Sequence, residues 1–270
     1  MTFSLQQIKE RIHSSLSVLK AAGIEVDLPE KLRSEWDSYE DALQSVSKNR
    51  REVPSKLDFT NAVSILKYHG LRIKFSDHLS KIIEEYELFD GDDSLFKRLI
   101  PDVKTYFEYG TGKSTQFVYK HYSADIYCVD TSREWADSVR KIIEDGKEQI
   151  LNIQWIDVGQ VAAWGVPTTD EYEFNFLKYA ESLWTLKVEP DLILIDGRFR
   201  VLCFLMCLRN ARPGTHILFD DYVDRQGYHV VEQFARRIET CGRQVLFEVG
   251  KLSKSKVTNE LIERYRLVTS

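Results

Sequence analysis

The chain has 270 residues, of which 43% are hydrophobic and 29% charged, and its net charge at pH 7 is -5. This length allows one large domain, or a domain with an extension, around a substantial core. The acidic balance excludes a chain-wide electrostatic footprint for nucleic acid. The longest apolar run, residues 201–208, is far shorter than the roughly 20 residues that span a bilayer.

Residues 3–22 contain several charged side chains, so they do not resemble the apolar core of a signal peptide. The four cysteines are scattered without metal-binding spacing, and we expect them to be reduced, buried thiols. We therefore expect a soluble, cytoplasmic protein with no nucleic-acid partner and no membrane span.

Residues 1–99 predict a helical extension. Apolar residues recur every three or four positions in four segments, a spacing typical of amphipathic helices. These segments lie at residues 5–19, 32–43, 59–69 and 76–86. No catalytic constellation is present in them. The extension is expected either to cover one wall of an active site or to form a homo-oligomer surface, and the sequence leaves both open.

Residues 100–270 alternate between strand and helix patterns. Strands are predicted at residues 103–107, 125–129, 151–158, 191–195, 216–219, 244–249 and 265–268, and helices at 114–121, 132–144, 200–210 and 228–240. Such alternation favours a parallel sheet with helices on both faces. The predicted fold is α/β: a Rossmann-like, doubly wound, mostly parallel seven-stranded sheet preceded by the helical extension.

Acidic residues follow five consecutive predicted strands, and in a doubly wound sheet ligands bind beyond these strand ends. They are Glu108, Asp130, Asp157, Asp196 and the pair Asp220–Asp221. Acidic residues make up only 42 of the 270 positions, so chance would rarely give this pattern. This acidic rim is the strongest functional signal in the sequence.

Residues 105–115, T-Y-F-E-Y-G-T-G-K-S-T, combine a strand, a glycine turn and a helix start, which is typical of a nucleotide cradle. A P-loop would need glycine at position 107, where Phe107 stands. A dinucleotide site fits Gly110 and Gly112 better, with Asp130 near the expected 20-residue spacing. However, Thr115 replaces the third glycine of that motif, and Glu108 would face the negative pyrophosphate.

S-adenosylmethionine (SAM) carries a sulfonium and an ammonium group instead of phosphates, so an acidic rim attracts it. In this interpretation Glu108 lies near the aminoacyl end, Asp130 receives the ribose hydroxyls, and Asp157 accepts the adenine amino group. We therefore predict SAM as the cofactor. An NAD(P)-dependent oxidoreductase and a non-catalytic scaffold that kept the cradle are the alternatives.

The segment E-Y-G-T-G-K-S-T together with Asp130 resembles the first two motifs of class I SAM-dependent methyltransferases. The segments D-L-I-L-I-D-G (191–197) and R-P-G-T-H-I-L-F-D-D-Y (212–222) resemble the fourth and fifth strands of that family. W-G-x-P (164–167), D-G-R-F-R (196–200) and F-D-D-Y (219–222) are similar to bacterial members. The resemblance covers roughly residues 100–270 and implies a methyltransferase domain there.

The cofactor is expected to contact the glycine turn and the strand ends. The predicted cofactor-binding residues are Glu108, Tyr109, Gly110, Thr111, Gly112, Ser114, Asp130, Thr131, Asp157, Val158 and Asp196.

The predicted reaction is O-methylation of a small or glycan-type acceptor, for which a general base or a divalent metal must deprotonate the hydroxyl. Asp196, Asp220 and Asp221 are the candidate catalytic carboxylates. They are also candidate Mg²⁺ ligands, resembling the metal-dependent branch that methylates catechols and macrolide sugars. Pairing of these aspartates with Arg198 or Arg200 is the competing interpretation. His229 is a second candidate base.

Four residues are predicted to bind the acceptor. Trp164 follows Asp157 outside any helical periodicity, which favours a role as a substrate or adenine wall. Arg198 and Arg200 suit an acidic acceptor through bidentate contacts. Tyr222 follows the two aspartates directly and completes the set.

Overall fold

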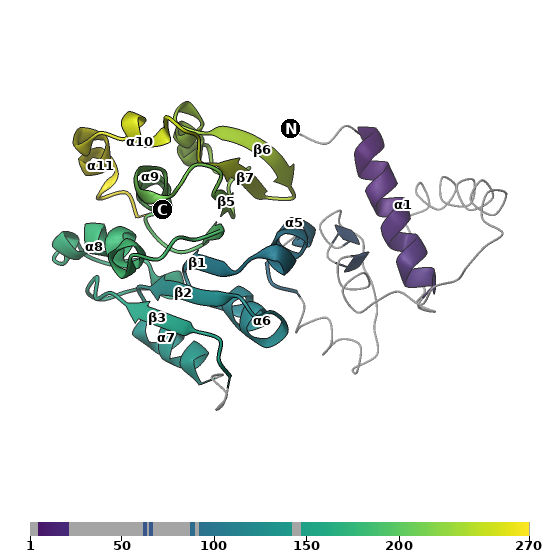
Figure 1. The fold of residues 1–270 in the computed structure, drawn as a ribbon, viewed down its shortest axis with the longest axis horizontal. Helices are drawn as coiled ribbons and strands as arrows, with labels where there is room; N and C mark the ends of the chain where they lie inside the picture. The colour runs from purple at the N-terminus through teal and green to yellow at the C-terminus, as the bar shows by residue number, and fades with distance from the viewer. Residues whose placement is uncertain are drawn as a thin grey trace. The chain divides into compact units, whose positions relative to one another are not determined.

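The computed structural model of the protein describes residues 5–21, 62–63, 65–66, 87–89, 92–141 and 147–269. The chain divides into two compact units, Met1–Leu95 and Phe96–Ser270 (Figure 1). Among the helices of the described residues, none has the length and apolar content needed to cross a bilayer.

The first unit contains the long helix α1 (Leu5–Ala21), which matches the first predicted helical segment. Ile12, Leu16 and Leu19 are buried along one stripe of this helix. Residues 62–63 and 65–66 are helical, inside the third predicted segment. The predicted helices at 32–43 and 76–86 lie outside the described residues.

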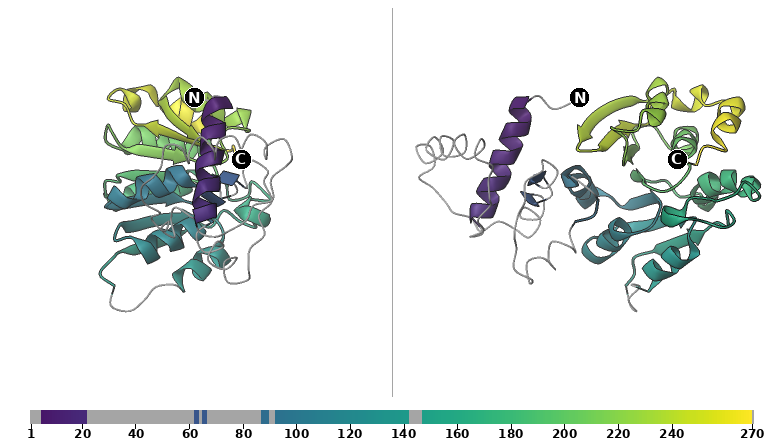
Figure 2. Two further views of the ribbon diagram at one scale, coloured as in Figure 1. Left: turned by 90° about the vertical axis from the view of Figure 1, so that its right-hand side faces the viewer. Right: turned by 180° about the vertical axis from the view of Figure 1, so that it is seen from behind.

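The second unit is built on a seven-stranded sheet in the order β3-β2-β1-β4-β5-β7-β6. Strands β1 to β5 are parallel, whereas β7 is antiparallel to both β5 and β6. Figure 2 shows β6 and β7 as a ribbon at one edge of the sheet. The strands are β1 (Thr105–Tyr109), β2 (Asp125–Asp130), β3 (Leu151–Trp155), β4 (Leu192–Ile195), β5 (His216–Phe219), β6 (Arg236–Cys241) and β7 (Gln244–Glu248).

Helices cover the sheet as expected for a doubly wound fold. Helices α6 (Lys113–His121) and α7 (Arg133–Arg140) pack against β2, and α7 also contacts β3 (Figure 1). Helix α9 (Arg200–Asn210) contacts α8 (Phe176–Glu181), α10 (Ser253–Lys256) and α11 (Asn259–Tyr265). The short helix α5 (Ser94–Leu99) precedes β1.

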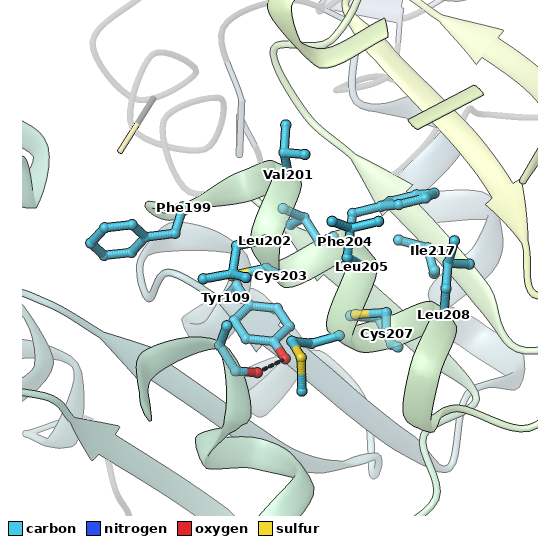
Figure 3. Packing of buried hydrophobic residues seen from close by; sticks show 14 of the residues in the cluster. Tyr109, Phe199, Val201, Leu202, Cys203, Phe204, Leu205, Cys207, Leu208 and Ile217 are labelled. Carbon is cyan, nitrogen blue, oxygen red and sulfur yellow. Dashed lines mark hydrogen bonds between the residues drawn. The ribbon is translucent and has the colours of Figure 1, made fainter. Parts of the chain in front are cut away.

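Helix α9 contains the longest apolar run of the sequence, and residues 200–208 are all buried. A helix that is apolar on every side belongs in a core rather than on a surface. Figure 3 shows its side chains packed around Tyr109 of β1 and Ile217 of β5. The four cysteines are free and buried, as predicted.

The seven-stranded, mostly parallel sheet is confirmed, but two of its predicted elements are wrong. Residues 228–240 form no single helix: a 3₁₀ segment at Gln226–Gln233 leads into strand β6. The second half of this segment is a strand because a two-residue turn at Gly242 and Arg243 joins it to β7 in a hairpin. Gly242 in this turn has φ +56°. Positive φ at a two-residue turn is the geometry that joins antiparallel strands.

The second error concerns residues 265–268, which form no strand. Helix α11 ends at Tyr265, and its start is fixed by Thr258, whose side chain accepts a hydrogen bond from the Leu261 N–H. Threonine is a favoured helix N-cap because its oxygen satisfies one of the free N–H groups of the first turn. The seventh strand of the sheet is therefore β6, which pairs with β7 in the hairpin and forms the edge of the sheet.

Candidate functional site

The glycine turn follows β1 at the point where the strand order reverses between β1 and β4. Gly110 has φ +98°, and its N–H donates to the Val129 carbonyl at 2.8 Å. Such a switch point leaves a crevice beyond the strand ends, where open α/β sheets bind their ligands. The turn that the sequence singled out therefore lies at the expected binding edge.

A second glycine, Gly197, meets this turn from the loop after β4. A Cβ atom on Gly110 would lie 3.0 Å from the Gly197 nitrogen. A Cβ atom on Gly197 would lie 2.7 Å from the Gly110 nitrogen and 2.3 Å from the Tyr179 hydroxyl. The two backbones are thus in direct contact, and the close approach requires glycine on both sides.

Glu108 is buried inside β1, and its carboxylate is bound to the start of α6. The Ser114 hydroxyl donates to one oxygen, and the Thr115 hydroxyl donates to the other at 2.7 Å. Thr115 in turn accepts from the Gly112 N–H at 3.0 Å. Burial raises the pKa of Glu108 to about 7, although the two hydroxyls lower it. Glu108 therefore holds the glycine turn in place through Thr115.

Asp130, at the end of β2, is bound to the same turn. Its Oδ2 accepts from the N–H (2.8 Å) and the hydroxyl (3.1 Å) of Thr111, and its Oδ1 accepts from the Ser132 N–H at 2.7 Å. Burial raises its pKa. The Thr131 N–H is a further donor to Asp130, so the roughly four acceptor positions of this carboxylate are all used within the protein. Asp130 therefore holds the glycine turn in place, and its contact with a ribose hydroxyl stays a prediction.

The W-G-x-P segment forms a closed loop anchored to the end of β2. Val161 pairs with Pro167, and the Thr131 hydroxyl donates to the Gly165 carbonyl at 2.8 Å. Trp164, at the tip, has φ +63° and is 86% exposed. Its side chain is therefore available to a ligand rather than part of the core.

The other predicted cofactor residues differ in accessibility. Asp157 is exposed and lies two residues beyond the end of β3, with its Oδ1 accepting from the Gly159 N–H at 3.0 Å. Val158 is buried in the core. The Tyr109 hydroxyl donates to the Ala180 carbonyl at 2.7 Å (Figure 3). The side chains of Val158 and Tyr109 therefore belong to the core, and they do not face a cofactor.

Asp196, Asp220 and Asp221 converge at the ends of β4 and β5. One carboxylate oxygen from each lies within 4.8 Å of the others. The Asp220 side chain is fully buried, whereas a third of the Asp196 side chain is exposed. Burial and the neighbouring Asp220 raise the pKa of Asp196 to about 8. The convergence follows from the topology, because the carboxyl ends of adjacent parallel strands share one edge.

Three arginines neutralise these three carboxylates, so the cluster as arranged does not fit Mg²⁺. Hard oxygen donors are present, but each carboxylate already contacts a guanidinium that supplies the positive charge. The ion pairs join Arg200 to Asp196 (3.0 Å) and Asp221 (3.2 Å), Arg243 to Asp220 (2.9 Å) and Asp221 (2.9 Å), and Arg225 to Asp221 (2.8 Å).

This cluster corrects two of the predicted acceptor contacts. Arg200 is buried, and it also donates to the carbonyls of Gly197 and Asp220, so it is a structural residue. Tyr222 is buried and donates to Glu232 at 3.1 Å, so it does not face an acceptor.

His229 stacks on the Tyr222 ring, with 5.0 Å between ring centroids. Its Nε2 lies 3.2 Å from the Tyr222 carbonyl, which only accepts, so the Nε2 carries the proton. His229 therefore packs on the Tyr222 ring and hydrogen-bonds to its carbonyl, and its role as a base stays a prediction.

Sequence patterns did not identify three further residues of this region. Arg225 and Arg243 complete the ion-pair cluster, and Arg243 comes from the β6–β7 hairpin turn. The Trp135 indole N–H donates to the Thr111 carbonyl of the glycine turn, although half of its side chain is exposed. A tryptophan in the first turn of the helix after β2 was the signal that the sequence offered.

The chain matches no protein-family model and no curated protein sequence. Among solved structures, it is similar to a methyltransferase-like protein from Silicibacter pomeroyi, with a TM-score of 0.57 and 26% identity over 65% of this chain and 93% of that one. The unit Phe96–Ser270 has the Rossmann-like methyltransferase fold.

A more distant similarity is to an RNA methyltransferase from Salinibacter ruber, whose structure holds S-adenosyl-L-homocysteine (SAH). Its TM-score is 0.34 and its identity 9%, over 59% of this chain and 90% of that one. Only the first similarity is close enough to support an argument about the methyltransferase fold of this chain.

Proposed function

We propose that the protein is a SAM-dependent methyltransferase that methylates a hydroxyl group of a small or glycan-type acceptor. The observation that carries this proposal is the glycine turn at the β1/β4 switch point of a sheet with an antiparallel β7. The dinucleotide-binding Rossmann sheet has the strand order 3-2-1-4-5-6, whereas this sheet has the order 3-2-1-4-5-7-6 with β7 antiparallel, which favours SAM over a dinucleotide. The similarity to the Silicibacter pomeroyi protein supports the same choice.

The residues at this edge suit SAM. Gly110 packs directly against Gly197 and Gly112 lies against Trp135, so these glycines shape the turn, and the Asp130 carboxylate fixes it from the end of β2. We assign Glu108 to positioning the turn rather than to direct contact, because Ser114 and Thr115 occupy its oxygens. Trp164 and Asp157 remain available to the adenine or the acceptor.

Asp196 is the best candidate for the general base. When bound, SAM supplies a sulfonium methyl group, which the acceptor oxygen attacks while the carbon–sulfur bond breaks and its electron pair stays on SAH. Asp196 would take the hydroxyl proton. It is partly exposed beside the switch point, and its raised pKa of about 8 is close to neutral pH, the range in which a side chain is most effective as a base. The buried Asp220 and the paired Asp221 are assigned to positioning Asp196.

The substitution Asp196→Asn tests this assignment. General bases contribute about 10²-fold or more to the rate, so kcat for methyl transfer should fall by about that factor. Because the carboxylate must be ionised, the wild-type rate should rise with pH up to about 8 and then level off, and the variant should lack this rise.

Methyl transfer is measured by mass spectrometry on a panel of hydroxyl acceptors. Asp224→Asn is the matched control, since Asp224 is exposed and belongs to the loop after β5. A variant at position 196 with the wild-type rate and pH profile would remove Asp196 from the mechanism.

A further inference from the structure

Arg198 differs from the other arginines near the acidic rim. The guanidinium groups of Arg200, Arg225 and Arg243 each bind one or two of the three clustered carboxylates. Within the described part of the chain, the Arg198 side chain makes no ion pair and no hydrogen bond. Its Nε is buried without a partner.

The ion pairs of the region leave Arg198 without a partner among the described residues of the protein. Each of the three clustered carboxylates is paired with another arginine, so none of them forms an ion pair with Arg198. Burial and the neighbouring Arg200 lower the pKa of Arg198, which means that the folded protein bears a cost for keeping this cation partly desolvated. A buried charge without a partner is unfavourable unless another group compensates it.

The position of Arg198 indicates which molecule supplies that group. Arg198 directly follows Asp196 and Gly197 at the end of β4, on the side of the switch point that leads to β5. The glycine turn, Asp130 and the Trp164 loop lie at the ends of β1 and β2 and beyond β3. A cofactor lying over β1 to β3 leaves the edge at β4 and β5 to the acceptor.

We propose that Arg198 binds an anionic group, a carboxylate or a phosphate, on the acceptor. This inference rests on the proposed methyltransferase function and deepens it by naming the substrate class. Arginine suits this task because its planar guanidinium forms two parallel hydrogen bonds to a carboxylate or phosphate. The acceptor hydroxyl would then lie near Asp196, two residues before Arg198.

The test uses the full chain saturated with SAH and measures its thermal midpoint with glucuronate, inorganic phosphate or glucose at constant ionic strength. Glucuronate or phosphate should raise the midpoint of the wild type beyond the effect of chloride and of neutral glucose. In Arg198→Gln the apparent affinity for these anions should fall about tenfold or more. Arg264→Gln, which changes an exposed arginine of α11, should behave as the wild type.

Each other outcome overturns the proposal. The proposal is wrong if the anions do not raise the midpoint of the wild type more than chloride does, or if they raise the midpoint of Arg198→Gln as much as that of the wild type. If Arg198→Gln instead weakens SAH binding about tenfold, the partner of Arg198 is the carboxylate of the cofactor. Absence of SAH binding to the wild type refutes the proposed function, whereas the same anion titration without SAH still tests the Arg198 site.

Discussion

Glu108 and Asp220 illustrate what single residues do in this site. Both are buried carboxylates, and each has a raised pKa because burial disfavours its charged form. Glu108 is bound by two hydroxyl groups, whereas Asp220 is paired with Arg243. The two residues therefore predict different responses to substitution.

The substitution Glu108→Gln should change how stability depends on pH. The folded-state pKa of Glu108 is raised from 4.5 to about 7, so the folded state holds the proton more tightly than the unfolded state between these values. Stability from this group is present at low pH and is lost as pH rises through this window, by about 3 kcal/mol at most.

Urea unfolding at pH 5, 6, 7 and 8 measures this effect as the difference between wild type and variant. Glu108→Gln should gain about 2 kcal/mol relative to the wild type across this range. Glu263→Gln is the control, because Glu263 is 60% exposed. A pH-independent difference between wild type and Glu108→Gln would contradict the assigned pKa.

The substitution Arg243→Met leaves Asp220 buried without its closest partner. Breaking a buried pair from one side costs about 3 kcal/mol or more, whereas exposed pairs contribute about 1 kcal/mol or less. Arg225→Met is the matched control, because Arg225 pairs with Asp221 but is 46% exposed. Chemical unfolding of the two variants should separate them clearly, and equal losses would mean that Asp220 does not depend on Arg243.

At the scale of elements, the strands of the parallel sheet were predictable because buried parallel strands are continuous apolar runs. The sequence also predicted that the carboxyl ends of β1, β2, β4 and β5 lie together at one edge of the sheet. The hairpin of β6 and β7 was not recognised, since a helical spacing in residues 228–240 obscured the turn at Gly242. As a result, the partner of Asp220 was missed: Arg243 reaches it only through that hairpin.

The contact between the β1 turn and the β4 loop predicts a strong effect of Gly197→Ala. The added methyl group would overlap backbone atoms of Tyr109 and Gly110 at 2.9 and 2.7 Å. Overpacking of this kind costs about 1–3 kcal/mol, and it should also weaken SAH binding because the turn must move.

Calorimetric titration with SAH and chemical unfolding measure the two effects of Gly197→Ala. Gly227→Ala is the control, because a Cβ atom there would meet nothing within 4 Å. Its stability should stay within about 0.5 kcal/mol of the wild type. Wild-type SAH affinity in Gly197→Ala would show that the two loops do not shape the binding edge.

For the whole molecule, the sequence predicted the fold class and placed the glycine turn at the switch point of the sheet, because alternating periods determine both. It did not predict which rim carboxylates are accessible. Burial of Glu108 and neutralisation of Asp196, Asp220 and Asp221 depend on side chains brought together by tertiary packing. Local periodicity cannot predict such contacts. The rim therefore presents less negative charge to a ligand than the sequence alone indicated.

The choice of cofactor is tested most directly by thermal unfolding of the full chain with SAH or with NAD. A ligand at 100 times its dissociation constant adds about 2.7 kcal/mol, which corresponds to a rise of roughly 5–10 °C for a domain of this size. SAH should produce this rise and NAD none. A rise with NAD and none with SAH would contradict the proposed methyltransferase function.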